Sequence, residues 1–176
     1  MRSDSISIDN KGNGFEAALS QAEAVAKYRG LNEKEALQLR ILTEELMGMV
    51  RSITGEMAGT FWIDSEGKAF TLHLSTKTRM DASKRYQLIA ASTSKANEEA
   101  KSFIGFLRDK FESAMLAEDN ICYDSNGMPL DELPEEEEPD RYEYSILRKL
   151  ADEIKIHVRG GTVELDVLKK IGRAHV

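Results

Sequence analysis

The apolar positions of residues 39–53, LRILTEELMGMVRSI, recur at the spacing of one helical face. Asn32 and Glu35 precede this segment with the spacing of a capping box, in which two side chains each accept a hydrogen bond from the other residue's backbone N–H. The pattern predicts a long amphipathic helix that starts after Asn32 and ends near residue 53. Its apolar stripe consists of Leu39, Leu42, Leu46, Met49, Val50 and Ile53.

Residues 153–170 alternate apolar and polar side chains on both sides of a Gly160-Gly161 pair. A two-residue glycine turn is typical of a β-hairpin. With the turn at this pair, six apolar side chains share one face of the hairpin. The predicted pairs are Val158 with Val163, Ile156 with Leu165, and Ile154 with Val167.

Residues 60–76, TFWIDSEGKAFTLHLST, predict a second hairpin. A turn at Glu66-Gly67 puts the apolar residues on one side of it. The predicted pairs are then Ile63 with Phe70 and Phe61 with Leu72. We interpret these aromatic residues, and Trp62 beside them, as hairpin packing rather than as a surface that stacks on nucleic-acid bases.

The remaining segments complete an α+β pattern. Residues 5–9 predict a short strand, and residues 15–30, 81–91, 98–116 and 141–153 predict helices. Residues 92–97, STSKAN, interrupt the helical region, and the helix after them carries Ile104, Leu107, Phe111 and Met115 at helical spacing. We therefore expect a two-layer sandwich, in which an antiparallel-rich mixed sheet carries helices on one face.

The other face of that sheet should be polar and should meet solvent or a partner. Alternation puts His73 and His157 on it. Two histidines could share a metal ion, but the sequence offers no nearby cysteine or spaced acidic pair to complete a site. We expect unliganded histidines there. Its other predicted members are Thr71, Ser75, Lys155 and Arg159.

Composition adds limits on the class of protein. The 176 residues suit a single domain, residues 1–176, and the net charge of −7 disfavours nucleic-acid partners. No apolar run is long enough for a membrane span, and Cys122 is the one cysteine, so we expect a cytoplasmic protein. Residues 128–140 combine three prolines with a carboxylate run, which predicts a mobile acidic loop rather than a calcium site.

Glu44 and Gly48 lie opposite the apolar stripe of the long helix, one turn apart. A carboxylate followed one turn later by a small residue can frame a shallow pocket. The simpler interpretation is a solvated helix face with an incidental glycine, because charged residues are mostly exposed.

The order of these segments resembles the gyrase and histidine-kinase ATPase superfamily (GHKL), in particular its small anti-sigma-factor-like serine kinases. The resemblance covers residues 15–80 and 141–170 and includes TEELMGMV and the closing SILRKLADEIKIHVRGGTVELDVLKK. It implies a histidine-kinase-like ATPase fold. It also implies that Glu44 corresponds to the glutamate that activates the attacking group.

The other residues that the resemblance implies are absent. Gly48 stands where the family has an asparagine for Mg²⁺, and glycine offers no side-chain oxygen. Thr76 replaces the adenine-binding aspartate, and Thr78 replaces the first glycine after it. Tyr142 and Tyr144 occupy the stretch where a Gly-x-Gly pair would approach phosphates.

We therefore expect a degenerate nucleotide site, no cofactor, and a cytoplasmic regulatory role in binding a protein partner. By resemblance that partner is a transcription regulator or an anti-sigma-antagonist-like protein. The alternative is an active ATP-dependent serine kinase or ATPase that binds ATP and Mg²⁺ and uses Glu44 as its base. A third interpretation is an unrelated α+β domain with a similar layout.

Overall fold

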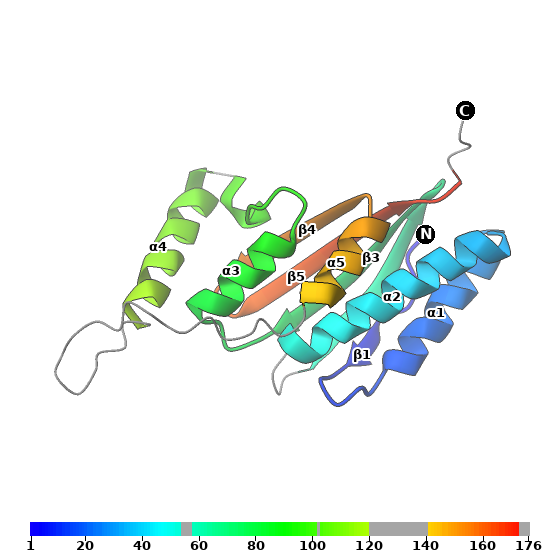
Figure 1. The fold of residues 1–176 in the computed structure, drawn as a ribbon, viewed down its shortest axis with the longest axis horizontal. Coiled ribbons are helices and arrows are strands. Elements are labelled where there is room, and N and C mark those ends of the chain that lie inside the picture. The colour runs from blue at the N-terminus through cyan, green and yellow to red at the C-terminus, as the bar shows by residue number, and fades with distance from the viewer. Residues whose placement is uncertain (54–57, 102, 120–140, 173–176) are drawn as a thin grey trace.

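The computed structural model describes residues 1–53, 58–101, 103–119 and 141–172 (Figure 1). Five strands and five α-helices follow one another along this part of the chain, together with one 3₁₀ helix, η1. In chain order they are β1 (Ile6–Ile8), α1 (Phe15–Tyr28), α2 (Glu33–Ile53), β2 (Gly59–Glu66), β3 (Ala69–Lys77), α3 (Ala82–Ala91), η1 (Glu98–Lys101), α4 (Phe103–Asp119), α5 (Arg141–Leu150), β4 (Glu153–Arg159) and β5 (Thr162–Lys170).

The strands form one sheet in the order β1-β2-β3-β5-β4, and each of the four pairings is antiparallel. Helices α1, α2, α3 and α5 lie over one face of this sheet, whereas α4 lies beyond its end (Figure 1). This confirms the predicted α+β, two-layer class. The two hairpins adjoin through β3 and β5, so strands from distant parts of the sequence meet at the centre of the sheet.

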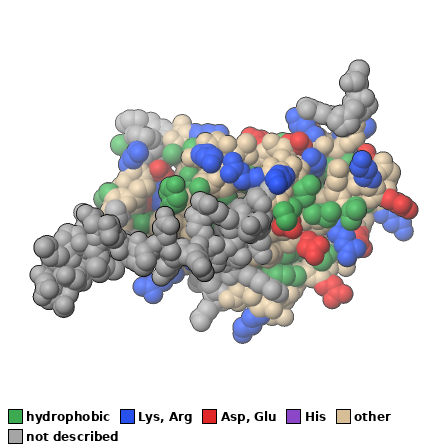
Figure 2. Space-filling view, in the orientation of Figure 1, with side chains coloured by type: hydrophobic (Ala, Val, Ile, Leu, Met, Phe, Trp, Pro, Cys, Tyr) green, Lys and Arg blue, Asp and Glu red, His purple; other side chains and the backbone are tan. Residues whose placement is uncertain are grey.

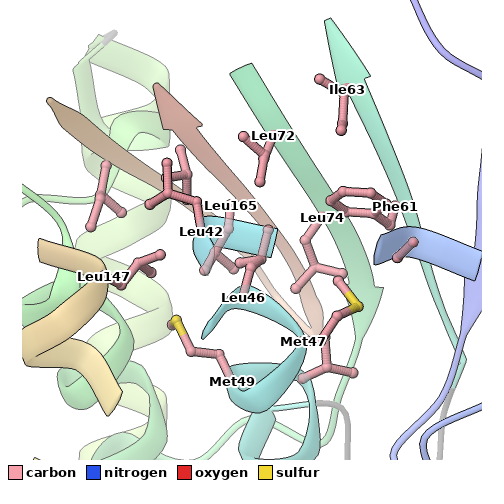
Figure 3. Close-up of a cluster of buried hydrophobic side chains, with 14 of the residues drawn as sticks. Leu42, Leu46, Met47, Met49, Phe61, Ile63, Leu72, Leu74, Leu147 and Leu165 are labelled. Carbon is pink, nitrogen blue, oxygen red and sulfur yellow. The ribbon is translucent and has the colours of Figure 1, made fainter. Parts of the chain in front are cut away.

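The apolar stripe of α2 packs on the sheet, as predicted. Leu42, Leu46 and Met49 are buried and point toward residues of the sheet and α5 such as Leu74 and Leu147 (Figure 3). The helix starts at the predicted capping box: Asn32 N–H donates to Glu35 Oε2 over 2.9 Å, and Glu35 N–H donates to Asn32 Oδ1 over 3.0 Å. The side chain of Ile53, the last member of the predicted stripe, lies outside the described part of the structure.

The register of the second hairpin is the predicted one. All three apolar pairs across the Gly160-Gly161 turn are present between β4 and β5. The predicted register of the first hairpin is wrong by two residues. Its turn is Gly67-Lys68, so Ile63 pairs with Leu72 and Phe61 with Leu74.

The physical reason for the first register lies in Gly67. Its φ of +57° suits the first position of a two-residue turn, where primed turns need positive φ. A shift of two residues keeps every side chain on its original face, because side chains alternate with a period of two. Phe61, Ile63, Phe70 and Leu72 are therefore still buried against the helices.

Residues 92–97 cover the outer edge of β4. Thr93 N–H donates to the Ile154 carbonyl over 2.9 Å, and Ile154 N–H donates to Thr93 Oγ1 over 2.6 Å. Farther along the strand, the buried Asn97 amide pairs with both backbone groups of Val158 over 2.8 Å each. The segment that the sequence marks as a helix interruption thus takes the place of a neighbouring strand.

Three apolar residues of helix α4 point outward. Leu107, Phe111 and Met115 are 52%, 66% and 52% exposed, although their spacing is that of a core-facing stripe. The side chain of Ile104 lies outside the described part of the structure. Hydrophobic side chains appear at this end of the surface among charged ones (Figure 2).

Several predictions concern residues that the structure does not describe. The acidic loop at 128–140 and Cys122 are among them. Of the helices that are described, none combines the length and the apolar character needed to cross a bilayer.

Candidate functional site

The outer side of α2 carries the position that the family resemblance assigns to catalysis. Glu44 is exposed there, and Gly48, one turn later, is half-buried. Both positions follow from the burial of the stripe on the opposite side of the helix. The Glu44 carboxylate therefore contacts solvent, and Gly48, one turn later, supplies no side-chain atom that could bind a metal ion.

Thr76 and Thr78 lie at the end of β3 and are buried, with 2% and 4% exposure. Thr76 faces the helical layer, and its hydroxyl donates to the Lys77 carbonyl over 3.3 Å. The Thr78 hydroxyl accepts a hydrogen bond from Lys84 Nζ over 3.0 Å, while Thr78 N–H donates to the Gly161 carbonyl over 2.8 Å. The polar groups of Thr78 are thus used inside the protein.

The exposed Glu44 and the buried threonines do not share one environment. Lys84 also donates to the Arg79 carbonyl over 3.3 Å, so its ammonium group secures the β3–α3 connection. The side chains of Tyr142 and Tyr144 fall outside the described structure. Among these described positions, Glu44 is exposed to solvent, whereas the hydroxyl groups of Thr76 and Thr78 form hydrogen bonds within the protein.

A denser cluster of ionisable groups lies on the opposite face of the sheet, around His73. His73 Nδ1 lies 2.7 Å from Asp166 Oδ1, and His73 Nε2 lies 3.1 Å from Asp64 Oδ2. Asp166 is the direct neighbour of His73 on β5. Each ring nitrogen of His73 therefore faces a carboxylate oxygen.

The cluster continues to β4 through the second oxygen of Asp166. His157 Nε2 lies 3.3 Å from Asp166 Oδ2, and His157 Nδ1 lies 3.5 Å from Glu99 Oε1 in η1. Asp166 thus bridges two histidines, and His157 connects the sheet with η1. An open depression of about 370 Å³ adjoins His157 and is lined by Glu99, His157, Arg159, Thr162 and Glu164.

The cluster also reaches the N-terminal segment. Arg2 binds Asp64 with two hydrogen bonds, of 3.0 Å from Nε and 2.8 Å from Nη2. Trp62 stacks on His73 with a centroid separation of 4.9 Å and an interplanar angle of 10°. Arg2 Cζ lies 5.6 Å from the centroid of the Trp62 ring, which is cation–π geometry. Arg2, Asp64, His73, Asp166, His157 and Glu99 form a continuous line, here called the histidine line.

The ionisation of its two aspartates reflects these contacts. Burial alone would raise the pKa of Asp166, but the hydrogen bond and charge of His73, together with the charge of His157, outweigh it and hold that pKa below the usual range. The hydrogen bond from Arg2 is the main cause that lowers the pKa of Asp64, against a smaller opposing effect of burial. Both carboxyl groups are therefore negative at neutral pH.

This arrangement suits holding protons rather than transferring them to a substrate. A general base needs a free lone pair within reach of the substrate, and both nitrogens of His73 already face carboxylates. Among the described residues, no group of three or more His, Cys, Asp or Glu side chains is placed to hold a metal ion.

Sequence reasoning placed both histidines on this face correctly but missed their acidic partners. The missing information was the β3–β5 pairing, which joins two separate hairpins and sets Asp166 beside His73. Trp62, predicted to take part in hairpin packing, stacks on His73, its cross-strand neighbour in the hairpin, on the open face. The correct register of the first hairpin puts Trp62 directly opposite His73 and would have revealed the pair.

Comparison of the sequence with protein-family models gives no match, and comparison with curated proteins gives none either.

Proposed function

We propose that the protein is a regulatory protein-binding module on a histidine-kinase-like ATPase fold, with a degenerate nucleotide site. The resemblance in the order of elements supports the fold relationship. The loss of nucleotide binding is supported by Gly48, which has no oxygen for Mg²⁺, and by Thr78, whose hydroxyl is bonded to Lys84.

The observation that carries the binding role is the orientation of α4. On its inner side, Asp109 and Ser113 contact the buried Arg85 of α3. Its outer side exposes Leu107, Phe111 and Met115, here called the α4 stripe. Exposed apolar side chains grouped on one side of a helix are typical of an interaction surface.

The energy available on the α4 stripe fits a modest interaction. Full burial of a leucine, phenylalanine or methionine side chain contributes about 1.5–3 kcal/mol, and each side chain of the stripe is already partly covered. Association also costs translational and rotational freedom. The stripe therefore suits an anchor within a larger interface. By resemblance the protein partner is a transcription regulator, whose apolar side chains would pack against the stripe.

The nucleotide part of the proposal is tested by thermal unfolding with ATP and Mg²⁺. A ligand present at 100 times its dissociation constant would stabilise the protein by about 2.7 kcal/mol and raise the melting temperature by several degrees. We expect no shift at millimolar ATP. A shift, together with a Glu44→Ala variant that binds ATP but no longer transfers phosphate, would instead establish the active serine kinase or ATPase.

The binding part is tested with a matched pair of variants. Phe111→Ser removes the centre of the α4 stripe, and Tyr86→Ser removes another well-exposed aromatic side chain, from α3. A partner isolated with the wild-type protein should be purified and its affinity for all three proteins measured. We expect at least tenfold weaker binding for Phe111→Ser and unchanged binding for Tyr86→Ser. Equal affinities for all three would contradict a role for α4.

A further inference from the structure

The two histidines of the histidine line share an unusual feature: both nitrogens of each ring face carboxylate oxygens. For His73 the distances are 2.7 Å to Asp166 and 3.1 Å to Asp64. For His157 they are 3.3 Å to Asp166 and 3.5 Å to Glu99. Neutral imidazole has one N–H donor and one lone pair, whereas the imidazolium form has two N–H donors. Only the protonated ring can therefore donate toward both carboxylates.

In the neutral form, one nitrogen of each ring would direct its lone pair at a negatively charged oxygen. Such a contact is repulsive. Of the four contacts, the one between His157 and Glu99 is the longest and the most exposed. Glu99 belongs to η1, which is attached to the sheet at one end by the bonds between Asn97 and Val158. Loss of the proton would thus weaken the contact of η1 with the open face first.

We propose that His73 and His157 form a proton-operated latch that fastens η1 to the sheet when both rings are protonated and releases it when they are neutral. Histidine loses its charge on deprotonation, so the stability that the latch contributes is present while the rings are protonated and is lost when the pH is raised far enough to neutralise them. This inference does not depend on what α4 binds.

Most of the charged groups that face the two rings are carboxylates. His73 faces Asp64 of β2, with Arg2 behind it, and Asp166 of β5. His157 faces Asp166 and Glu99 and is the cross-strand neighbour of Glu164. The nearby cations on its own strand are Lys155, which lies 3.5 Å from Glu153, and Arg159, which lines the depression.

Asp166 couples the two rings, because each of its oxygens contacts one of them. Protonation of either histidine fixes the orientation of this carboxylate, which places its other oxygen for the contact with the second ring. The two protonation steps should therefore depend on one another through Asp166.

The chain contains its own reporter for the first ring. Trp62 is its single tryptophan, and it stacks on His73. Protonated imidazole quenches indole fluorescence by contact, so emission from the native protein should rise as the pH is raised from 5 to 8. His73→Gln should abolish this rise. A flat emission profile in the wild-type protein would overturn the proposal.

Movement of η1 is tested by hydrogen exchange of the Val158 amide, which donates to Asn97 Oδ1. We expect its protection, corrected for the intrinsic exchange rate, to fall at least threefold more than that of Leu74 in β3 between pH 5.5 and 8. In Glu99→Gln, whose neutral side chain cannot attract the imidazolium as a charged group, the protection of Val158 relative to Leu74 should be the same at both pH values. A protection ratio that stays constant with pH in the wild-type protein would show that no latch opens.

Discussion

The two helix pairs of this molecule are held together by different means. Helix α1 packs against α2 through small apolar side chains such as Ala18, Ala22 and Val25, all buried. Helix α3 meets α4 through Arg85, which contacts Asp109 and Glu112 of α4. Burial of apolar surface has no preferred direction, whereas ion pairs need one geometry. The α1–α2 half is thus the fixed part of the fold, and α4 is attached by a specific joint.

The joint is a buried polar network rather than a surface ion pair. Arg85 is 4% exposed, and Asp109 also accepts a hydrogen bond from Asn97 Nδ2 over 2.7 Å. Asn97 in turn holds Val158 at the edge of the sheet. Among the described side chains, α4 therefore meets α3 and Asn97 through a few charged and polar groups, whereas α2 is positioned by many apolar contacts.

The largest expected effect is in the apolar half. Leu46 is fully buried between α2 and the sheet, so Leu46→Asp would bury an unpaired charge and cost about 4 kcal/mol or more of unfolding free energy. Leu107→Asp, on the exposed α4 stripe, should change stability by less than about 0.5 kcal/mol. Urea denaturation of both variants measures the contrast. Equal losses would mean that the two halves do not differ in the way described.

The next effect concerns the joint. Arg85→Ala leaves Asp109 and Glu112 without their cation and should cost about 3 kcal/mol, the low end for a broken buried pair, because both carboxylates keep some exposure. The loss should be confined to α4, as a decrease in helical circular dichroism before the main urea transition. Tyr86→Ala, at the exposed neighbouring position, serves as the control. A single cooperative transition in Arg85→Ala would show that α4 is not attached separately.

A smaller effect should appear in acid. Because the folded-state pKa of Asp166 is lowered, the stability from its ionised form is fully present above the unfolded value of about 3.9 and is lost as the pH falls through the lower folded value. Asp166→Asn should remove about 1 kcal/mol at neutral pH. Its stability should then fall less steeply than that of the wild-type protein below pH 4, in urea titrations at each pH. Parallel acid profiles would indicate that Asp166 does not contribute.

The smallest effect is expected on the outer side of α2. Gly48 is half-buried in the helix, and asparagine is the better helix former, so Gly48→Asn should raise stability by about 0.3 kcal/mol. It should not create ATP binding, because Thr76 and Thr78 are unchanged. Thermal unfolding with and without Mg²⁺-ATP tests both statements. A loss of more than about 1 kcal/mol would reveal a close contact at this glycine.

The sequence predicted those features whose signals are local. The α2 stripe and its capping box depend on residues within one helix, and the β4–β5 register depends on a glycine pair at the centre of a symmetric apolar pattern. The first hairpin lacks such symmetry, because Glu66, Gly67 and Lys68 allow two turn positions with identical faces. Its register was accordingly wrong by two residues while its buried face was right.

Features that join distant segments were not predictable in this way. The spacing of Leu107, Phe111 and Met115 indicates an amphipathic helix, but it does not tell which partner covers the apolar side. Likewise, His73 and Asp166 meet only because β3 pairs with β5. The buried Arg85 carries no periodic signal, and its role follows only from the positions of Asp109 and Glu112 on another helix.

The Asn97 side chain has a consequence for self-assembly. An uncovered outer strand can template the addition of a strand from another molecule, and proteins avoid this by blocking such edges. Here one amide occupies both backbone groups of Val158, and Thr93 occupies those of Ile154. The opposite border of the sheet is the three-residue β1, too short to recruit a long strand. Resistance to fibrillar aggregation on the β4 side therefore depends on two polar residues, Thr93 and Asn97, in a six-residue connection.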